Sequence, residues 1–214
     1  MKIFSRARIH YFILCVLMLP LGLLLVNPLP SSAQQSQLSA RTVVNRTRAY
    51  MSHAGGVRLH FHCKALGLYN YSGDMLIKDN KSMLISERHT VWNNGQVAWA
   101  LDKAKNTVTI SNPKNEQNNR IADQLAIVDN CDLTIASAGN NWRITLKPRT
   151  RMGFFNRGEV LIDKKTYYPT QLRLRYLTIW ITVNISNFSL QEYPDALFTF
   201  DRKKYPTAKI IDKR

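Results

Sequence analysis

Apolar and polar positions alternate most clearly between residues 69 and 111. Residues 73–78, 81–86 and 106–111 are short runs rich in apolar and β-branched side chains, and each is bounded by residues that favour turns. Asn94-Gly95 predicts a two-residue hairpin, because a type I′ turn needs positive φ at both of its central positions. This region therefore predicts an antiparallel meander of about five strands.

Several of these strands are apolar on both faces. Met75 and Ile77 lie two residues apart in one strand, and Met83 and Ile85 do so in the next, with Leu84 expected to point the other way. A sheet with one face in water is polar on that side. The pattern therefore predicts that both faces of the sheet are covered or line an apolar space.

The rest of the chain alternates between helical and strand periods. Ser39 is a candidate N-cap for a helix over 39–52, and Ile121 and Leu125 share one face of a second helix over 115–128. Further strands are predicted at 57–66, 132–137, 142–146, 154–162, 171–176, 178–188 and 197–200. About ten or eleven strands with two helices predict a mainly β (α+β) domain, with one large antiparallel sheet and helices against one face.

The first 33 residues have the pattern of a secretory signal. Lys2, Arg6 and Arg8 precede an apolar run over 11–26, and small residues end the segment at Ala33. We expect cleavage after Ala33, with residues 34–214 forming one exported domain; an uncleaved membrane anchor is the alternative.

Positive charge dominates the chain. The formal net charge is +16, and it falls to +13 when the three cations of the signal are removed. Nucleic acid is not an expected partner of an exported protein, so this excess points to anionic membrane surfaces or acidic proteins. A generally basic surface without a specific target is the alternative.

Catalytic and metal-binding motifs are scarce. His60 and His62 lie two residues apart on one strand face, as two metal ligands could, but Arg58 and Lys64 flank them, so a polar outer face explains them more simply. The sequence contains no glycine-rich phosphate loop and no nucleophile motif. We therefore predict no enzymatic activity, no metal and no cofactor.

Two cysteines remain after the predicted signal. An exported compartment permits a disulfide between Cys63 and Cys131. Leu59, Phe61 and Cys63 also share one apolar strand face, so Cys63 could equally be a small buried residue. Both possibilities stay open at this point.

Several segments together resemble the bacterial outer-membrane lipoprotein carrier proteins, the LolA-like family, and in particular its divergent branch. The resemblance lies in residues 73–78, 92–99, 108–113, 162–171, 186–188, 193–195 and 198–200, which occur in the order and spacing typical of the family. It implies an incomplete antiparallel barrel with helices as a lid over an apolar cavity.

The resemblance also implies a function. A carrier of this kind works as a monomer in the periplasm, shields the acyl chains of lipoproteins, and takes them from the inner to the outer membrane. Its partners are the lipoproteins, an inner-membrane lipoprotein-releasing transporter, and an outer-membrane acceptor or the membrane surface. Many members have Arg-Pro after the strand over 73–78, and that arginine helps to hold the lid closed. Here Asp79-Asn80 occupies these positions, and an acid cannot donate the same hydrogen bonds.

Apolar residues of the predicted sheet and of the second helix are the candidates for the acyl-chain cavity. They are Leu59, Phe61, Met75, Ile77, Met83, Ile85, Trp99 and Leu101 from the sheet, with Ile121 and Leu125 from the lid. Each of them could equally belong to an ordinary core. Two other functions remain open: a lipid- or lipoprotein-sensing regulator on the same fold, and an exported hydrolase.

Overall fold

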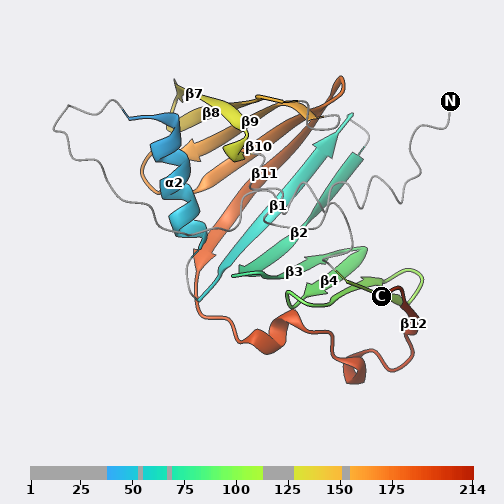
Figure 1. Cartoon of the computed structure of the whole chain (residues 1–214). Coiled ribbons are helices and arrows are strands. Elements are labelled where there is room, and N and C mark those ends of the chain that lie inside the picture. Colours follow the sequence, from blue (N-terminus) through green and yellow to red (C-terminus); the bar gives the residue numbers. More distant parts are fainter. Residues whose placement is uncertain (1–37, 53–54, 67–68, 113–127, 151–154) are drawn as a thin grey trace.

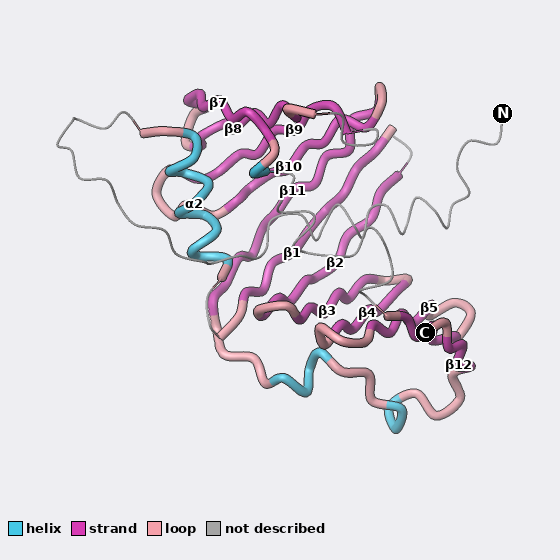
Figure 2. The backbone as a smooth tube through the Cα atoms, viewed as in Figure 1, coloured by secondary structure: helices cyan, strands magenta, loops and turns pink. Residues whose placement is uncertain are grey.

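Twelve strands form one open sheet in the computed structural model, which describes residues 38–52, 55–66, 69–112, 128–150 and 155–214. The strand order is β12-β6-β5-β4-β3-β2-β1-β11-β10-β9-β8-β7. Neighbouring strands are antiparallel except β12, which pairs with β6 in parallel. The predicted fold class, a mainly β protein with one curved, incomplete barrel, is confirmed (Figures 1 and 2).

The sheet consists of two meanders that meet where β1 pairs with β11. The first meander comprises β1 Val57–Ala65, β2 Tyr69–Lys78, β3 Lys81–Ser86, β4 His89–Asn93, β5 Ala98–Asp102 and β6 Thr107–Ser111. The second comprises β7 Cys131–Ala138, β8 Asn141–Pro148, β9 Phe155–Asp163, β10 Pro169–Tyr176 and β11 Ile179–Leu190, and the chain then ends with β12 Lys209–Asp212.

Within the described residues, one α-helix longer than a single turn, α2 (Ala40–Met51), lies across the sheet beside β7 to β11 (Figure 1). The Ser39 hydroxyl caps it as predicted, since Ser39 Oγ accepts a hydrogen bond from the Thr42 amide at 3.0 Å. Its buried side chains are Ala40, Val43, Thr47 and Met51, spaced by three or four residues, so a single stripe faces the sheet. The predicted second helix falls almost wholly outside the described residues.

The inner face of the sheet, on which α2 lies, is apolar from one meander to the other. Leu59 pairs with Met75, Met75 with Leu84, and Leu84 with Val91, and all four side chains are buried in one core cluster. Residues paired across antiparallel strands share a face, so this row continues the core through β1 to β4. Leu172, Leu174, Ile181 and Val183 extend the same cluster into the second meander.

The register of the β2–β3 hairpin corrects part of the predicted inner face. Its two-residue turn pairs Lys78 with Lys81, which places Leu84 opposite Met75 and Met83 opposite Leu76. Met83 and Ile85 therefore point to the outer face, and Leu84 to the inner one. A register shifted by one residue would exchange the two faces of β3. Because β3 is apolar on both faces, its composition alone does not show whether Leu84, or Met83 and Ile85, face inward.

The segment after β11 covers the outer face of the first meander (Figure 1). Phe198 is buried with Leu76 and Tyr193, and Met83 packs against this cluster. Trp92, Leu101, Val108 and Ala208 form a second cluster, which Trp99, Phe200 and Tyr205 complete. Apolar side chains on both faces of the first meander thus have separate partners.

Two local predictions in this region are wrong. The loop after β4 has four residues, because Asn93 and Asn94 side chains accept hydrogen bonds from the amides of Gly95, Gln96 and Val97 and so stabilise a wider turn. Residues 197–200 do not form a strand; Asp195–Phe198 is a 3-10 helix. The last strand is instead β12, which pairs with the edge strand β6.

Candidate functional site

An apolar pocket lies between α2 and the inner face of β8 to β11. Its volume is about 70 Å³. The residues that line it are Val44, Thr47, Arg48, Val128, Ile144, Leu146, Phe155, Val160, Ile162, Pro169, Leu172, Leu174 and Ile185. Apart from Thr47 and Arg48, every lining side chain is apolar, so the pocket suits a hydrocarbon ligand rather than a polar one.

Two cross-strand rows form the floor of the pocket. Ile144 pairs with Val160, and Val160 pairs with Leu172, so β8, β9 and β10 present three branched side chains side by side. In the row two residues further along these strands, Gly158 lies between Leu146 and Leu174. A Cβ atom at Gly158 would lie 3.2 Å from both leucine side chains, so the glycine leaves room for them to approach each other.

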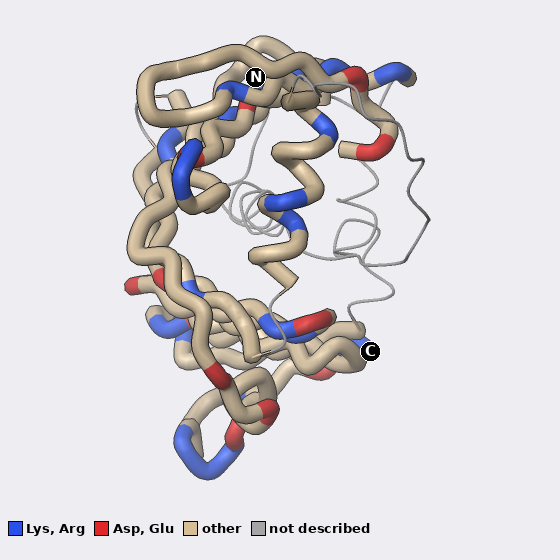
Figure 3. The backbone as a smooth tube through the Cα atoms, turned by 90° about the vertical axis from the view of Figure 1, so that its left-hand side faces the viewer, with Lys and Arg blue, Asp and Glu red and all other residues tan. Residues whose placement is uncertain are grey.

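Polar contacts hold α2 over the pocket. Arginines are spaced along this helix, where Figure 3 shows them in blue. Arg41 and Arg48 both bind Asp129 Oδ1, at 2.8 and 3.1 Å, and Arg46 donates a hydrogen bond to the Tyr167 hydroxyl at 2.7 Å. We call α2 the lid helix, because it is attached mainly by contacts at its edges and by a narrow apolar stripe.

Four of the predicted cavity residues lie on the inner face. Leu59, Phe61, Met75 and Ile77 are buried in the core cluster that also contains Leu172 and Leu174. They do not line the present pocket, but they continue its apolar floor from β10 and β11 into β1 and β2.

The other predicted cavity residues lie elsewhere. Met83, Trp99 and Leu101 pack beneath the C-terminal segment on the outer face, and Ile85 is exposed there. Ile121 and Leu125 lie outside the described residues. The prediction followed the apolar character of these strands and missed the register that separates their faces.

The residues that line the pocket are not among the predicted cavity residues. Their signal is nevertheless present: Ile144 and Leu146 alternate with polar residues in one strand, as Leu172 and Leu174 do in another. Only the folded topology shows that these strands, and not β3 to β5, lie beneath α2.

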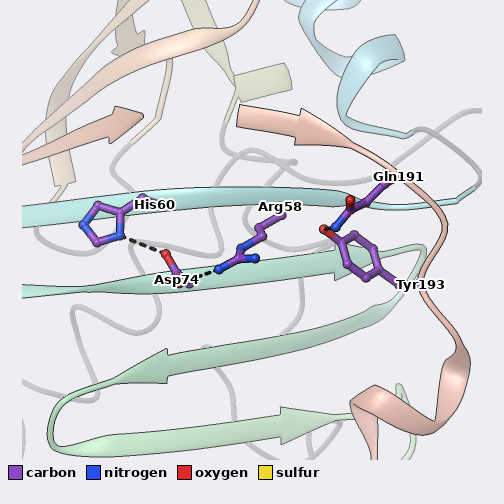
Figure 4. A network of polar contacts seen from close by, with 5 residues as sticks. All are labelled: Arg58, His60, Asp74, Gln191 and Tyr193. Atoms are coloured by element: carbon purple, nitrogen blue, oxygen red, sulfur yellow. Dashed lines mark hydrogen bonds and ion pairs between the residues drawn. The ribbon is translucent and has the colours of Figure 1, made fainter. Parts of the chain in front are cut away.

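A polar network occupies the outer face of β1 and β2 (Figure 4). Asp74 accepts hydrogen bonds from His60 Nδ1 and Arg58 Nη2, both at 2.9 Å, and His62 is hydrogen-bonded to Asn70. Although burial alone would raise it, these two donors hold the pKa of Asp74 below its ordinary value. Within the described residues, no three side chains of metal-ligand type come together.

Cys63 and Cys131 are both free and buried. Of the two possibilities, the disulfide is therefore wrong and the buried thiol is right. Burial raises the pKa of the Cys63 thiol to about 12, so this side chain behaves as a small apolar residue at neutral pH.

Comparison with solved structures finds several proteins to which this chain is similar. An uncharacterised conserved protein from Thermus thermophilus is similar with a TM-score of 0.55 and 10% identity, over 81% of this chain and 99% of that one. A LolA superfamily protein from Nitrosomonas europaea has a TM-score of 0.40 and 10% identity, over 77% and 99%. The MucA/MucB complex structure of Pseudomonas aeruginosa is similar with a TM-score of 0.41 and 13% identity, over 75% of this chain and 61% of that one.

Sequence comparisons supply the family. A search of curated proteins gave no match. In the described part of the chain, none of the helices has the length and apolar character needed to span a bilayer. The sequence profile described as "Outer membrane lipoprotein carrier protein LolA" matches residues 29–177. This match covers more than half of the chain and agrees with the open sheet and the lid helix, and the chain therefore belongs to the LolA family of outer membrane lipoprotein carrier proteins.

Proposed function

We propose that this protein binds the acyl chains of lipids or lipoproteins in the pocket beneath α2, and that it carries lipoproteins through the periplasm from the inner to the outer membrane. The observation that carries the proposal is the apolar lining of this pocket, which two polar residues border on the side of the lid helix. Family membership supports the same function. No catalytic residue is part of the proposal.

The physical need for such a carrier is large. Each buried methylene group is worth about 0.8 kcal/mol, so one long acyl chain represents on the order of 10 kcal/mol against water. A pocket that is better than water and no better than the acceptor membrane suffices for transfer. Branched side chains from three strands offer that intermediate apolar surface.

Uptake of a whole acyl chain requires the lid helix to move. The pocket has a volume of about 70 Å³, whereas pockets for drug-sized ligands have about 300–1,000 Å³. Outward movement of α2 would enlarge the pocket and break the ion pairs of Arg41 and Arg48 with Asp129. We propose that a longer chain then reaches the inner-face residues Leu59 and Phe61.

These ion pairs also offer a substitute for the arginine that many family members carry at the position of Asp79. Asp79 lies in the β2–β3 turn with φ of 52° and has no guanidinium to donate. In this chain the arginines are on the lid helix and the acid is Asp129. We propose that these ion pairs hold the lid helix closed in place of that arginine.

The remaining parts of the proposal concern location and partners. We propose that residues 1–33 are a signal removed after Ala33, and that residues 34–214 act as one carrier domain in the periplasm. An inner-membrane transporter would load it, and an outer-membrane acceptor or the membrane itself would receive the cargo.

Uptake of a fluorescent fatty-acyl probe tests the proposal. Val44 lines the pocket from the lid helix and is only partly buried, so Val44→Asp can hydrate its carboxylate when the pocket is empty. We expect a cooperative melt close to that of the parent and a loss of probe uptake. Ala49→Asp adds the same charge to an exposed position of α2 and should take up the probe normally. Normal uptake by Val44→Asp would contradict the proposal.

A further inference from the structure

Two exposed leucines occupy neighbouring hairpin tips at one end of the sheet. Leu66 directly follows β1 and is 65% exposed, and Leu177 lies between β10 and β11 and is 46% exposed. Ala65 at the end of β1 pairs with Ile181 near the start of β11, which places the two tips side by side. Figure 1 shows the arrowhead of β1 next to the beginning of β11.

Both leucines adopt a backbone conformation that disfavours them. The φ angle is 56° at Leu66 and 56° at Leu177, in the left-handed region where a Cβ atom crowds the backbone and glycine or asparagine is preferred. The Leu177 carbonyl oxygen accepts a hydrogen bond from Asn156 Nδ2 at 2.8 Å, so the tip is held in this form. A leucine here is unfavourable for the backbone and exposes apolar surface, and neither effect stabilises the fold.

Cationic and aromatic side chains surround these tips. In the strand register, Arg175 lies opposite Trp180 of β11 and opposite Arg157 of β9. The Arg173 guanidinium lies 4.6 Å from the centre of the Trp180 ring. Lys64 is exposed next to Ala65 at the end of β1. The patch therefore combines several positive charges with a tryptophan, which is the residue type enriched at membrane–water interfaces.

Acidic residues do not balance this charge. Glu159 is the acid of the neighbouring part of β9, and it already binds Arg157 at 3.2 Å and Arg173 at 3.1 Å. Among the described residues, neither Lys64 nor Arg175 forms an ion pair with an acid. We define the tip surface as Leu66, Leu177, Trp180 and their cationic neighbours Lys64, Arg157, Arg173 and Arg175.

We propose that the tip surface docks on an anionic phospholipid bilayer. Leu66 and Leu177 enter the boundary between headgroups and acyl chains, the arginines and Lys64 contact the phosphates, and Trp180 lies at the headgroup level. An acidic protein would be attracted by the same cations. Two leucines at the tips of adjacent hairpins are better suited to penetrate a lipid surface than to pack in the centre of a flat protein interface.

Docking in this orientation brings the pocket close to the membrane. Leu174 lines the pocket and lies three residues before Leu177 in the chain. At about 3.3 Å per residue, the tip is about 10 Å from the pocket lining. This last step rests on the proposed function, whereas the docking itself does not depend on what the pocket holds.

Co-sedimentation with vesicles tests the docking. The parent chain should bind phosphatidylcholine vesicles that contain phosphatidylglycerol more tightly than pure phosphatidylcholine vesicles, and the binding should weaken as salt rises through physiological strength. The double variant Leu66→Asn/Leu177→Asn should bind the anionic vesicles about tenfold more weakly or worse, because the inserted apolar area is lost. Its melting temperature should equal or exceed that of the parent, since asparagine tolerates the left-handed conformation better than leucine.

Two controls make the result specific. Ile210 in β12 is 38% exposed, and Ile210→Asn should leave vesicle binding unchanged because it lies far from the tips in the sheet order. Val44→Asp should lose probe uptake and still bind vesicles, which separates docking from the function of the pocket. The proposal is overturned if the double variant binds anionic vesicles like the parent, or if the parent shows no preference for them. Salt-sensitive binding that is equal in the parent and the double variant would show that charge alone holds the chain on the vesicles, and it would overturn the insertion of the leucines.

Discussion

Leu84 and Ile85 are neighbours in β3, yet Leu84 is fully buried on the inner face of the sheet whereas Ile85 is 38% exposed on the outer face. The difference follows from the two-residue turn that pairs Lys78 with Lys81 and thereby aligns Leu84 with Met75. It gives a direct test of which face holds the core.

A carboxylate should be tolerated at one of these positions and not at the other. Leu84→Asp places an unpaired charge in the core cluster and should unfold the protein, while Ile85→Asp should melt close to the parent and take up the acyl probe normally. Leu84→Ala, which only removes volume, should cost about 2–5 kcal/mol in the free energy of unfolding. Thermal and urea melts measure these effects. Equal tolerance of aspartate at both positions would show that the assignment of faces is wrong.

The ion pairs of the lid helix should restrain its opening. Asp129→Asn removes the carboxylate that binds both Arg41 and Arg48. Both ion pairs are partly exposed, and such a pair contributes about 0.2–1 kcal/mol. We expect the rate of probe uptake to rise a few-fold, with a smaller effect on the melting temperature. Asp132→Asn, which removes the ion pair between Asp132 of β7 and Arg149, is the matched control and should not alter uptake. A slower uptake in Asp129→Asn would argue against a closing role for these contacts.

Acidification should reveal the stabilising role of Asp74. Its folded-state pKa lies below the ordinary value, so the unfolded chain takes up the proton first as pH falls. The stabilisation is therefore present above about pH 4 and is lost as pH falls through the depressed folded-state value. The difference in melting temperature between the parent and Asp74→Asn should be largest near neutral pH and should shrink below pH 4. A difference that persists undiminished at pH 2.5 would exclude this origin.

Neither cysteine should react while the protein is folded. Burial raises the pKa of both thiols, that of Cys63 to about 12, and the thiolate is the reactive species. Alkylation at pH 8 should be slow in buffer and complete in denaturant, as followed by intact mass. Rapid labelling of the folded protein would show that the thiols are accessible.

The fold could be predicted further from the sequence than the site could. Period-two alternation and the Ser39 cap identify most strands and α2, because these signals depend on residues close in sequence. The buried cross-strand row of Leu59, Met75, Leu84 and Val91 is also predictable once Asp79-Asn80 is taken as a two-residue turn. The pocket could not be predicted, since it depends on which strands lie beneath α2 and on the pairing of β1 with β11, between residues far apart in the chain.

The C-terminal segment was the least predictable part. Phe198 and Phe200 suggested a strand, yet they act as a cover for the outer face of β2 to β6. Lys78 and Lys81 fix this cover by binding Asp195, and both hydrogen bonds lower the pKa of that carboxyl group. No local pattern in the sequence indicates these long-range partners.

This cover has a consequence for the order of events during synthesis. Trp92, Trp99 and Leu101 leave the ribosome well before Phe200 and Tyr205, which complete their cluster, and β6 stays an open edge until β12 pairs with it. An uncovered apolar face beside an unpaired strand is a template for aggregation. The nascent chain therefore exposes this aggregation-prone face until Phe200, Tyr205 and β12 are available, and a stop codon shortly before β12 would harm solubility more than its distance from the pocket suggests.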